Sequence, residues 1–307
     1  MPELVRRNRR MSWILLGVFA ALAWVVASVL VAMGTPDPTA AVGIGGVMAL
    51  TLTGVRYATA PRSALLANHA RPAPRDAYPR LHNLVEEVAL AAGVPAPSVY
   101  VVDDPAPNAF ATGRSPDRAA IAVTTGLLDK LERSELEGVI AHEMAHIVND
   151  DVRVMTIAAA TAGTIAVLAD LFYRLLIWGV PGGRGRGNRR GGSGVLVLVV
   201  GPVLLILAPL AAALLRAAVS RRREALADAT AVEITRNPGG LRRALEKLDA
   251  DTTVVRHTSH ATSHLWIEAP DDHESRHPGR LVDKLFATHP PLAERIDLLR
   301  RLEGLPP

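Results

Sequence analysis

The sequence contains no cysteine, which excludes disulfide bonds, thiolate metal ligands and a cysteine nucleophile. Aromatic residues are scarce, at 4% of 307 residues, so the hydrophobic share of 49% consists mainly of Ala, Val and Leu. The chain also lacks the interleaved basic and aromatic residues that bind single-stranded nucleic acid. We therefore expect no nucleic-acid partner.

Positive charge is present, but it is unevenly placed. The formal net charge is +4, and much of the Arg stands in short runs beside apolar stretches, as in Arg6–Arg10. Such runs attract anionic lipid head groups and orient apolar segments in a bilayer. The placement of charge therefore predicts a lipid bilayer as a partner.

Two apolar segments follow the basic N-terminus. Met11–Met33 carries no charge and is long enough to span a bilayer. A secretory signal is the alternative, but the apolar run is too long for one and Met33-Gly34-Thr35-Pro36 is a poor cleavage site. Ala40–Val55 is a second, weaker segment that ends before Arg56 and Arg62. We expect a transmembrane hairpin with both basic flanks in the cytoplasm.

The next stretch has the pattern of a small α+β unit. It predicts a polar connector at Pro61–Ala77, a helix at Tyr78–Ala92 stopped by Gly93, and strands at Ser98–Val102 and Ala120–Thr124. A further edge strand is expected near Asn108–Gly113. Such a sheet suits a peptidase, because an extended peptide can add to its edge. An ordinary α+β core is the alternative.

The rest of the chain is organised around His142-Glu143-Met144-Ala145-His146, an HExxH pattern. On a helix, His142 and His146 lie one turn apart on one face, so both imidazoles can reach a single ion. Glu143 then lies beside the metal, where a carboxylate can take a proton from the attacking water. A chance HExxH on an amphipathic helix is the alternative.

The neighbouring residues support a helix at this motif. Ser134 and Glu137 have capping-box spacing, and apolar residues recur at helical spacing; these are Leu136, Val139, Ile140 and Ile147.

Two more long apolar segments, Val154–Val180 and Val195–Val219, flank a Gly/Arg-rich linker. Their length favours membrane spans over buried core helices, although the first contains Asp170 and Arg174, one turn apart and able to pair. Next, Glu224 and Asp228 lie one helical turn apart, a spacing that alone fits a solvated helix face.

The C-terminal part combines two helical patterns with a His-dense stretch. Leu241–Leu248 predicts a short amphipathic helix. Asp251–Pro278 carries five His, and a surface insertion with adventitious metal affinity is a better interpretation of it than a second metal site. A last helix is expected after Thr288–Pro291, with four residues facing inward: Ile296, Leu298, Leu299 and Leu302.

Taken together, the chain resembles the HtpX-type membrane zinc metalloproteases, relatives of the CAAX prenyl-protein endopeptidases. The resemblance covers nearly the whole chain. It rests on the N-terminal apolar hairpin, the HExxH pattern, the apolar pair after it and four further matches: Asn108–Gly113, Glu224–Asp228, Ala261–Pro270 and Phe286–Arg295.

The resemblance implies the site. One catalytic Zn²⁺ would be held by His142, His146 and Glu224, a set that leaves one coordination position open. Glu143 would be the general base, and Asp228 would hold the outer N–H of a ligating His. For the remaining roles the candidates are His289 and Arg295 as catalytic donors to the oxyanion and Asn108 as a binder of the substrate backbone, with cap or turn residues as the alternative for all three.

Shared ligands constrain the topology. Ligands of one ion must lie on one side of the membrane, so residues 154–219 must cross it twice or not at all. We expect two crossings, because exposed apolar surface costs roughly 25 cal/mol per Å². The expected parts are a hairpin at 1–62, a first catalytic part at 63–153, an apolar pair at 154–219 and a second catalytic part at 220–307.

The sequence thus predicts a mostly helical α+β integral membrane protein with transmembrane helices and a zincin-like catalytic domain built from a small sheet and the HExxH helix. We expect a zinc endopeptidase in the cell membrane, with its catalytic domain on the cytoplasmic side. Its expected substrates are polypeptides, above all membrane proteins, and its expected role is proteolytic quality control. The alternatives are a dedicated processing protease and a non-catalytic scaffold that contains zinc. Prenyl-protein processing is disfavoured, because too few apolar segments are present to enclose an intramembrane chamber.

Overall fold

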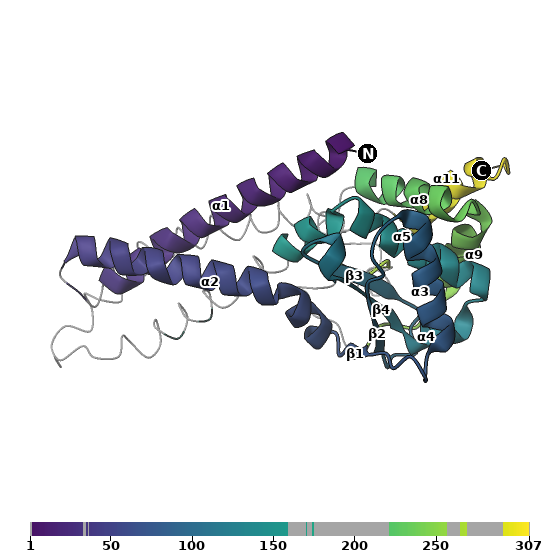
Figure 1. Cartoon of the computed structure of the whole chain (residues 1–307), viewed down its shortest axis with the longest axis horizontal. Helices are drawn as coiled ribbons and strands as arrows, with labels where there is room; N and C mark the ends of the chain where they lie inside the picture. Colours follow the sequence, from purple (N-terminus) through teal and green to yellow (C-terminus); the bar gives the residue numbers. More distant parts are fainter. Residues whose placement is uncertain are drawn as a thin grey trace, which may run out of the picture. The chain divides into compact units, whose positions relative to one another are not determined.

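The structure is a computed structural model that describes residues 2–32, 35, 37–158, 170, 174, 221–256, 265–268 and 291–306. The chain divides into two compact units (Figure 1). One comprises Met1–Arg9, Pro61–Thr156 and Leu215–Pro307, and the other comprises Arg10–Ala60 and Ile157–Leu214. Most of the predicted second apolar pair and most of the His-dense stretch lie outside the described residues.

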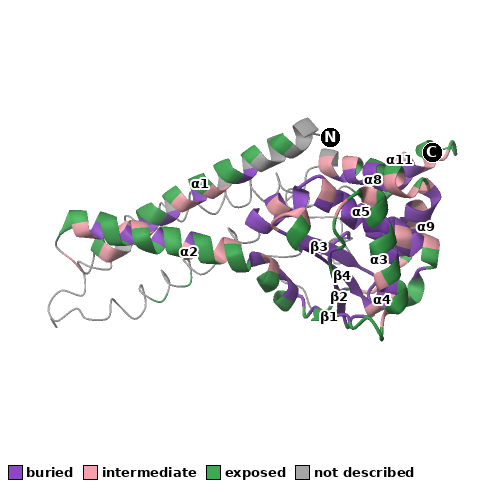
Figure 2. Cartoon of the chain, in the orientation of Figure 1, coloured by how far each residue is buried: buried purple, intermediate pink, exposed green. Residues whose placement is uncertain are grey.

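Two long helices form the N-terminal part: α1 at Pro2–Ala32 and α2 at Pro38–Ala67. Each contains a segment long and apolar enough to cross a membrane, Ser12–Val29 in α1 and Pro38–Ala67 in α2. Their apolar side chains are largely exposed (Figure 2), unlike those of a core helix in a water-soluble protein. Both segments therefore have the length and apolar composition that were predicted for membrane spans.

The two helices contact each other through a polar contact and a close approach. The Trp24 indole N–H donates to the Val42 carbonyl over 2.9 Å. A Cβ added at Gly45 would lie 2.4 Å from the Ser28 hydroxyl oxygen, so only glycine permits this approach.

The end of α2 differs from the expectation. Pro61–Ala77 was predicted as a connector, but α2 continues through Pro61 to Ala67. Proline removes one helical hydrogen bond, yet Ala64 and Leu65 beyond it are buried, at 4% and 7% exposure. Tertiary packing therefore outweighs the local tendency of proline to end the helix.

A four-stranded mixed sheet follows, in the order β1-β2-β4-β3. Its strands are β1 at Arg71–Pro72, β2 at Ser98–Val102, β3 at Ala109–Gly113 and β4 at Ala119–Thr124. β2 and β4 are parallel, whereas β1 pairs with β2 and β3 with β4 antiparallel. The three strands predicted from the sequence are confirmed, and β3 lies at one edge of the sheet.

The helices around the sheet follow the sequence pattern closely. They are α3 at Pro79–Ala92, α4 at Thr125–Lys130, α5 at Arg133–Val148, α8 at Arg221–Thr235, α9 at Pro238–Ala250 and α11 at Leu292–Leu302. Gly93 ends α3 in a left-handed conformation at φ 69°, as predicted. One hydrophobic core joins α3, α5, α9 and the strands.

The helix α5 lies at the centre of this core. The four apolar residues that recur at helical spacing in the sequence, Leu136, Val139, Ile140 and Ile147, are all buried. A Cβ on Gly138 would come within 2.5 Å of the Leu241 nitrogen in α9. The absence of a side chain at this position brings α9 against α5.

The start of α5 corrects the predicted cap. The N-cap is Glu132, and the capping box joins Glu132 to Glu135 rather than Ser134 to Glu137. Both pairs have the required spacing, but Glu132 has the extended backbone, φ −72° and ψ 166°, that an N-cap adopts.

The last helix also differs in part. Ile296 and Leu299 are buried in α11 as predicted, but Leu302 is 49% exposed and Leu298 only half-buried. Arg295 lies on the inward face instead, at 2% exposure. A buried arginine is tolerated at this position because it pairs with the carboxylate of Asp228 in the interior.

Candidate metal centre

The C-terminal half of α5 places the HExxH residues in the interior. His142, Glu143 and His146 are exposed by 1%, 2% and 4%. The two imidazole rings meet edge to face, with centroids 4.8 Å apart, because one helical turn separates them. Their Nε2 atoms lie 3.2 Å apart.

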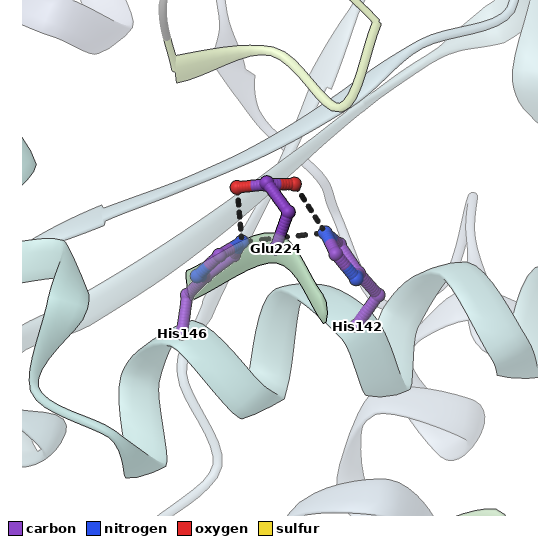
Figure 3. Close-up of side chains that lie close together, drawn as sticks. All are labelled: His142, His146 and Glu224. Carbon is purple, nitrogen blue, oxygen red and sulfur yellow. Dashed lines mark hydrogen bonds and ion pairs between the residues drawn. The ribbon is translucent and has the colours of Figure 1, made fainter. Parts of the chain in front are cut away.

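Glu224 of α8 completes the group (Figure 3). Its Oε2 lies 3.6 Å from His142 Nε2, and its Oε1 lies 3.6 Å from His146 Nε2. Ligand atoms about 2.1 Å from a tetrahedral zinc lie roughly 3.4 Å from one another. The spacing of this two-imidazole, one-carboxylate set therefore fits a single zinc ion.

Behind His142 lies a short, buried ion pair. Asp228 Oδ1 is 2.9 Å from His142 Nδ1, so an Nδ1–H that donates to it leaves Nε2 free to bind a metal. Arg295 holds this carboxylate with two bonds, of 2.7 Å from Nη2 and 3.0 Å from Nε. Burial opposes ionisation of Asp228, but the charge of Arg295 and the bond from His142 keep its pKa below the usual value.

Behind His146 lies a looser counterpart. Asp151 Oδ2 is 3.4 Å from His146 Nδ1, and Arg223 Nη1 is 3.5 Å from Asp151 Oδ1. Asp151 reaches this position because α5 ends at Val148, with Asn149 as its C-cap, and Asp150 takes a left-handed φ of 58°. Each imidazole of the pair is therefore backed by a carboxylate and an arginine.

Burial also shifts the ionisation of the motif itself. Desolvation raises the pKa of Glu143, although the charges of His142, His146 and Arg295 oppose the shift. Desolvation alone would lower the pKa of His146, but the bond to Asp151 and the nearby carboxylates of Glu224 and Glu143 raise it to about 9. Glu143 can therefore accept a proton and hold it within the site.

Arg295 reaches the centre from α11. Its Nη1 lies 3.7 Å from Glu224 Oε2, and its Nη2 lies 3.3 Å from His142 Nε2. The guanidinium also donates through Nη1 to the Ile267 carbonyl over 3.3 Å. The structure thus brings Arg295 beside two of the three candidate ligands, Glu224 and His142, whereas His289 lies outside the described residues.

Asn108 lies directly before β3 and is only 2% exposed. Its side chain binds the backbone of Leu265–Glu268, called here the edge segment. Asn108 Nδ2 donates to the Glu268 carbonyl over 2.8 Å, and its Oδ1 accepts from the Glu268 N–H over 3.3 Å. Asn108 therefore binds peptide backbone here, and its role toward a substrate stays a prediction.

Sequence reasoning missed Asp151, Arg223 and the edge segment's contacts. Asp151 follows His146 closely, but the left-handed residue between them breaks the helical period that would have linked the two. Arg223 belongs to a run of three arginines that follows the apolar segment Val195–Val219, where a basic membrane flank is expected. Only tertiary packing joins these residues to the site.

Comparison with known proteins gives the family. The model of peptidase family M48 matches residues 76–303. A Protease HtpX homolog of Caldanaerobacter subterraneus subsp. tengcongensis is 46% identical over 265 residues, which cover 85% of this chain and 86% of the relative. One of Streptococcus gordonii is 41% identical over 305 residues, covering 98% and 99% of the two chains.

A solved structure, that of S. mikatae Ste24p, has a TM-score of 0.49 and 16% identity, covering 96% of this chain and 66% of that chain. A likeness at this level does not by itself establish a shared fold.

Proposed function

The chain belongs to peptidase family M48, and from this we propose that it is a membrane-bound, zinc-dependent endopeptidase that cleaves membrane or misfolded proteins at the cytoplasmic face. The observation that carries the proposal is the spacing of His142, His146 and Glu224, which suits one zinc ion. Three protein ligands leave a coordination position open, as catalysis requires, whereas a structural zinc site is closed by four.

The proposed chemistry assigns a role to each buried polar group. Zinc, when bound, polarises the scissile carbonyl and lowers the pKa of a water molecule toward 7. Glu143 takes the proton of the attacking water and delivers it to the leaving amine; its burial, which raises its pKa, suits both steps. Asp228 and Asp151 fix the two imidazoles through their Nδ1 atoms.

Arg295 and Asn108 would act on the substrate. Arg295 carries a positive charge beside Glu224 and His142, where it can stabilise negative charge that develops on the scissile carbonyl. Asn108 already pairs with both the N–H and the C=O of one residue, Glu268, which is the way an amide side chain holds an extended substrate. His289 is a second candidate donor to the oxyanion, by resemblance.

The direct test is reversible removal of the metal. Purified protein in detergent should cleave a casein-type substrate, lose cleavage on chelation and regain it with about one equivalent of Zn²⁺. Cleavage that survives complete removal of zinc would contradict the proposal. Tight zinc without any cleavage would instead support the non-catalytic scaffold.

The orientation is a separate part of the proposal. The helices α1 and α2 meet the length and composition of membrane spans, and we propose that the apolar pair at 154–219 crosses as well. The absence of native cysteine allows a clean test with Ser98→Cys and Ser193→Cys, labelled in intact cells by an impermeant thiol reagent. Labelling at position 193 alone supports two crossings and a cytoplasmic catalytic domain, whereas protection of both positions argues against the second pair crossing.

A further inference from the structure

The outer edge of β3 faces away from β4. Asn108 uses its carbonyl to accept from Thr124 over 2.9 Å, so it faces β4. In an antiparallel pair the next residue faces the other way, and Ala109 does so. Its carbonyl accepts from the Ile267 N–H over 2.9 Å, and Phe110 and Trp266 are antiparallel bridge partners. The edge segment therefore lies on the free side of β3 as an added strand.

The edge segment is held largely through its main chain. Besides the Ile267 bond to Ala109, the Ile267 carbonyl accepts from Arg295, and both main-chain groups of Glu268 pair with Asn108. Any extended peptide carries the same N–H and C=O groups at the same spacing. These contacts are thus open to a substrate of almost any sequence.

Two of the side chains that hold the edge segment belong to the proposed active site. Arg295 touches the Ile267 carbonyl, Asp228 and His142 with one guanidinium. Asn108 is the residue expected to bind substrate backbone. A substrate main chain that used Asn108 and Arg295 as proposed would need the positions that Ile267 and Glu268 now fill.

The side chains of the edge segment supply its specific anchor. Trp266 is fully buried against Phe110, with ring centroids 4.7 Å apart in an edge-to-face arrangement. Yet its indole N–H has no hydrogen-bond acceptor among the described residues, and a buried unpaired donor is unfavourable. Trp266 is therefore held by apolar packing alone, with an unpaired N–H, which makes displacement of the edge segment from β3 easier.

We propose that Leu265–Glu268 is an internal occupant of the peptide-binding edge of β3, and that a substrate binds by replacing it in the same register. This inference rests on the proposed endopeptidase function. Substrate binding then exchanges one set of main-chain hydrogen bonds for an equivalent set. The net affinity for a substrate is set by how well its side chains compete with Trp266.

A disulfide lock tests the replacement. Phe110 and Trp266 form a pair that is not hydrogen-bonded, where Cα atoms of antiparallel strands lie about 4.5 Å apart, within the range that a disulfide spans. We expect the variant with Phe110→Cys and Trp266→Cys to form this bond on mild oxidation, since no other cysteine is present. The oxidised form should cleave peptides at least about tenfold more slowly than the same protein after reduction, with equal zinc content.

The reduced form is the matched control, because it differs from the locked form by one bond. Equal cleavage rates in the two forms would overturn the inference while leaving the endopeptidase function intact. Failure of the two cysteines to pair in the zinc-loaded protein would also overturn it. Loss of cleavage in the parent protein itself would instead contradict the proposed function.

A single substitution gives an independent measurement. Trp266→Ala weakens the anchor, so KM for a peptide substrate should fall by several-fold while zinc affinity is unchanged. Leu248→Ala, which truncates an equally buried side chain in α9, is the control for lost stability and should leave KM unchanged. A KM for Trp266→Ala equal to or above that of the parent would contradict the inference.

Discussion

The two ends of α5 are both rich in charge, but they differ in what surrounds that charge. At the C-terminal end, His142, Glu143 and His146 are buried and face buried carboxylates. At the N-terminal end, Glu135 caps the helix and pairs over 2.6 Å with Lys247, whose side chain is 42% exposed. The C-terminal end thus keeps its ionisable groups away from water, whereas the N-terminal end pairs the buried Glu135, at 2% exposure, with a lysine that reaches solvent.

This difference separates function from stability within one helix. Burying unneutralised charge is costly, so the polar groups at the C-terminal end must be matched to one another and, in the proposed function, to a zinc ion. At the N-terminal end, Glu135 satisfies a backbone donor, and the solvent-accessible Lys247 neutralises its charge. Substitutions at the first end should therefore change chemistry, and substitutions at the second should change only the free energy of unfolding.

The largest effect is expected at Glu143. Glu143→Gln keeps the shape of the side chain but removes the base, so kcat should fall by several orders of magnitude while zinc stays bound. Glu137→Gln, on the same helix and half-buried, is the matched control and should cleave normally. Near-normal cleavage by zinc-loaded Glu143→Gln would rule out the proposed base.

Next comes the carboxylate from α8. Glu224→Ala leaves two imidazoles, and two ligands hold zinc far more weakly than three. We expect loss of zinc affinity in a chelator competition assay together with loss of cleavage. Parent-like zinc affinity would mean that another residue is the third ligand, and His289 would be examined first.

The two carboxylates behind the imidazoles should differ in degree. Removing such a partner typically costs about 10–100-fold in metal affinity. Asp228→Asn should lie at the upper end, because its contact with His142 is 2.9 Å and wholly buried, whereas Asp151→Asn should cost less, because its contact with His146 is 3.4 Å. Chelator competition on both variants measures the order, and a reversed order would show that contact length does not set the effect.

At the other end of α5, only stability should respond. Glu135→Ala removes the capping-box acceptor and the partner of Lys247, and should cost about 1–3 kcal/mol of unfolding free energy. Glu137→Ala tests the cap predicted from sequence and should cost much less. Thermal unfolding in detergent measures both, and zinc affinity should match that of the parent in each.

The smallest effect concerns pH. Partial burial would raise the pKa of Asp251, but hydrogen bonds from Lys130 and Thr253 hold it below its usual value. A lowered pKa in the folded protein means that the ionised carboxylate stabilises the fold above about pH 3.9 and loses this contribution as the pH falls further. At pH 7, Asp251→Asn should reduce the free energy of unfolding by less than about 1 kcal/mol, which is seen as a slightly lower Tm. The difference from the parent should vanish in acid. A difference that grew in acid would have the wrong sign.

The elements were predictable because their signals are local. Gly93 stops α3, short apolar runs mark β2 and β4, and the apolar period of α5 gives its buried face. The failures have two causes. Two pairs near α5 share the capping-box spacing, and the extended backbone at Glu132 decided between them. Pro61 looks like a helix end, but packing of the residues beyond it extends the helix.

The candidate centre was predictable in part. The His142–His146 pair follows from helical spacing alone. Glu224 lies far along the chain, and its spacing from Asp228 by itself predicts only a solvated helix face. The family resemblance alone indicated that it is a metal ligand. Arg295 lies on the inward face of α11, where an apolar residue would be expected. It is tolerated there because it pairs with Asp228 in the interior. No local pattern encodes such a pair.

The most direct test locates the metal. Anomalous diffraction at the zinc edge from crystals of zinc-loaded Glu143→Gln protein should give one peak about 2.0–2.2 Å from His142 Nε2, His146 Nε2 and a Glu224 oxygen. The fourth position should hold a non-protein ligand. A peak elsewhere, or a fourth ligand supplied by the protein, would contradict a catalytic zinc at this centre.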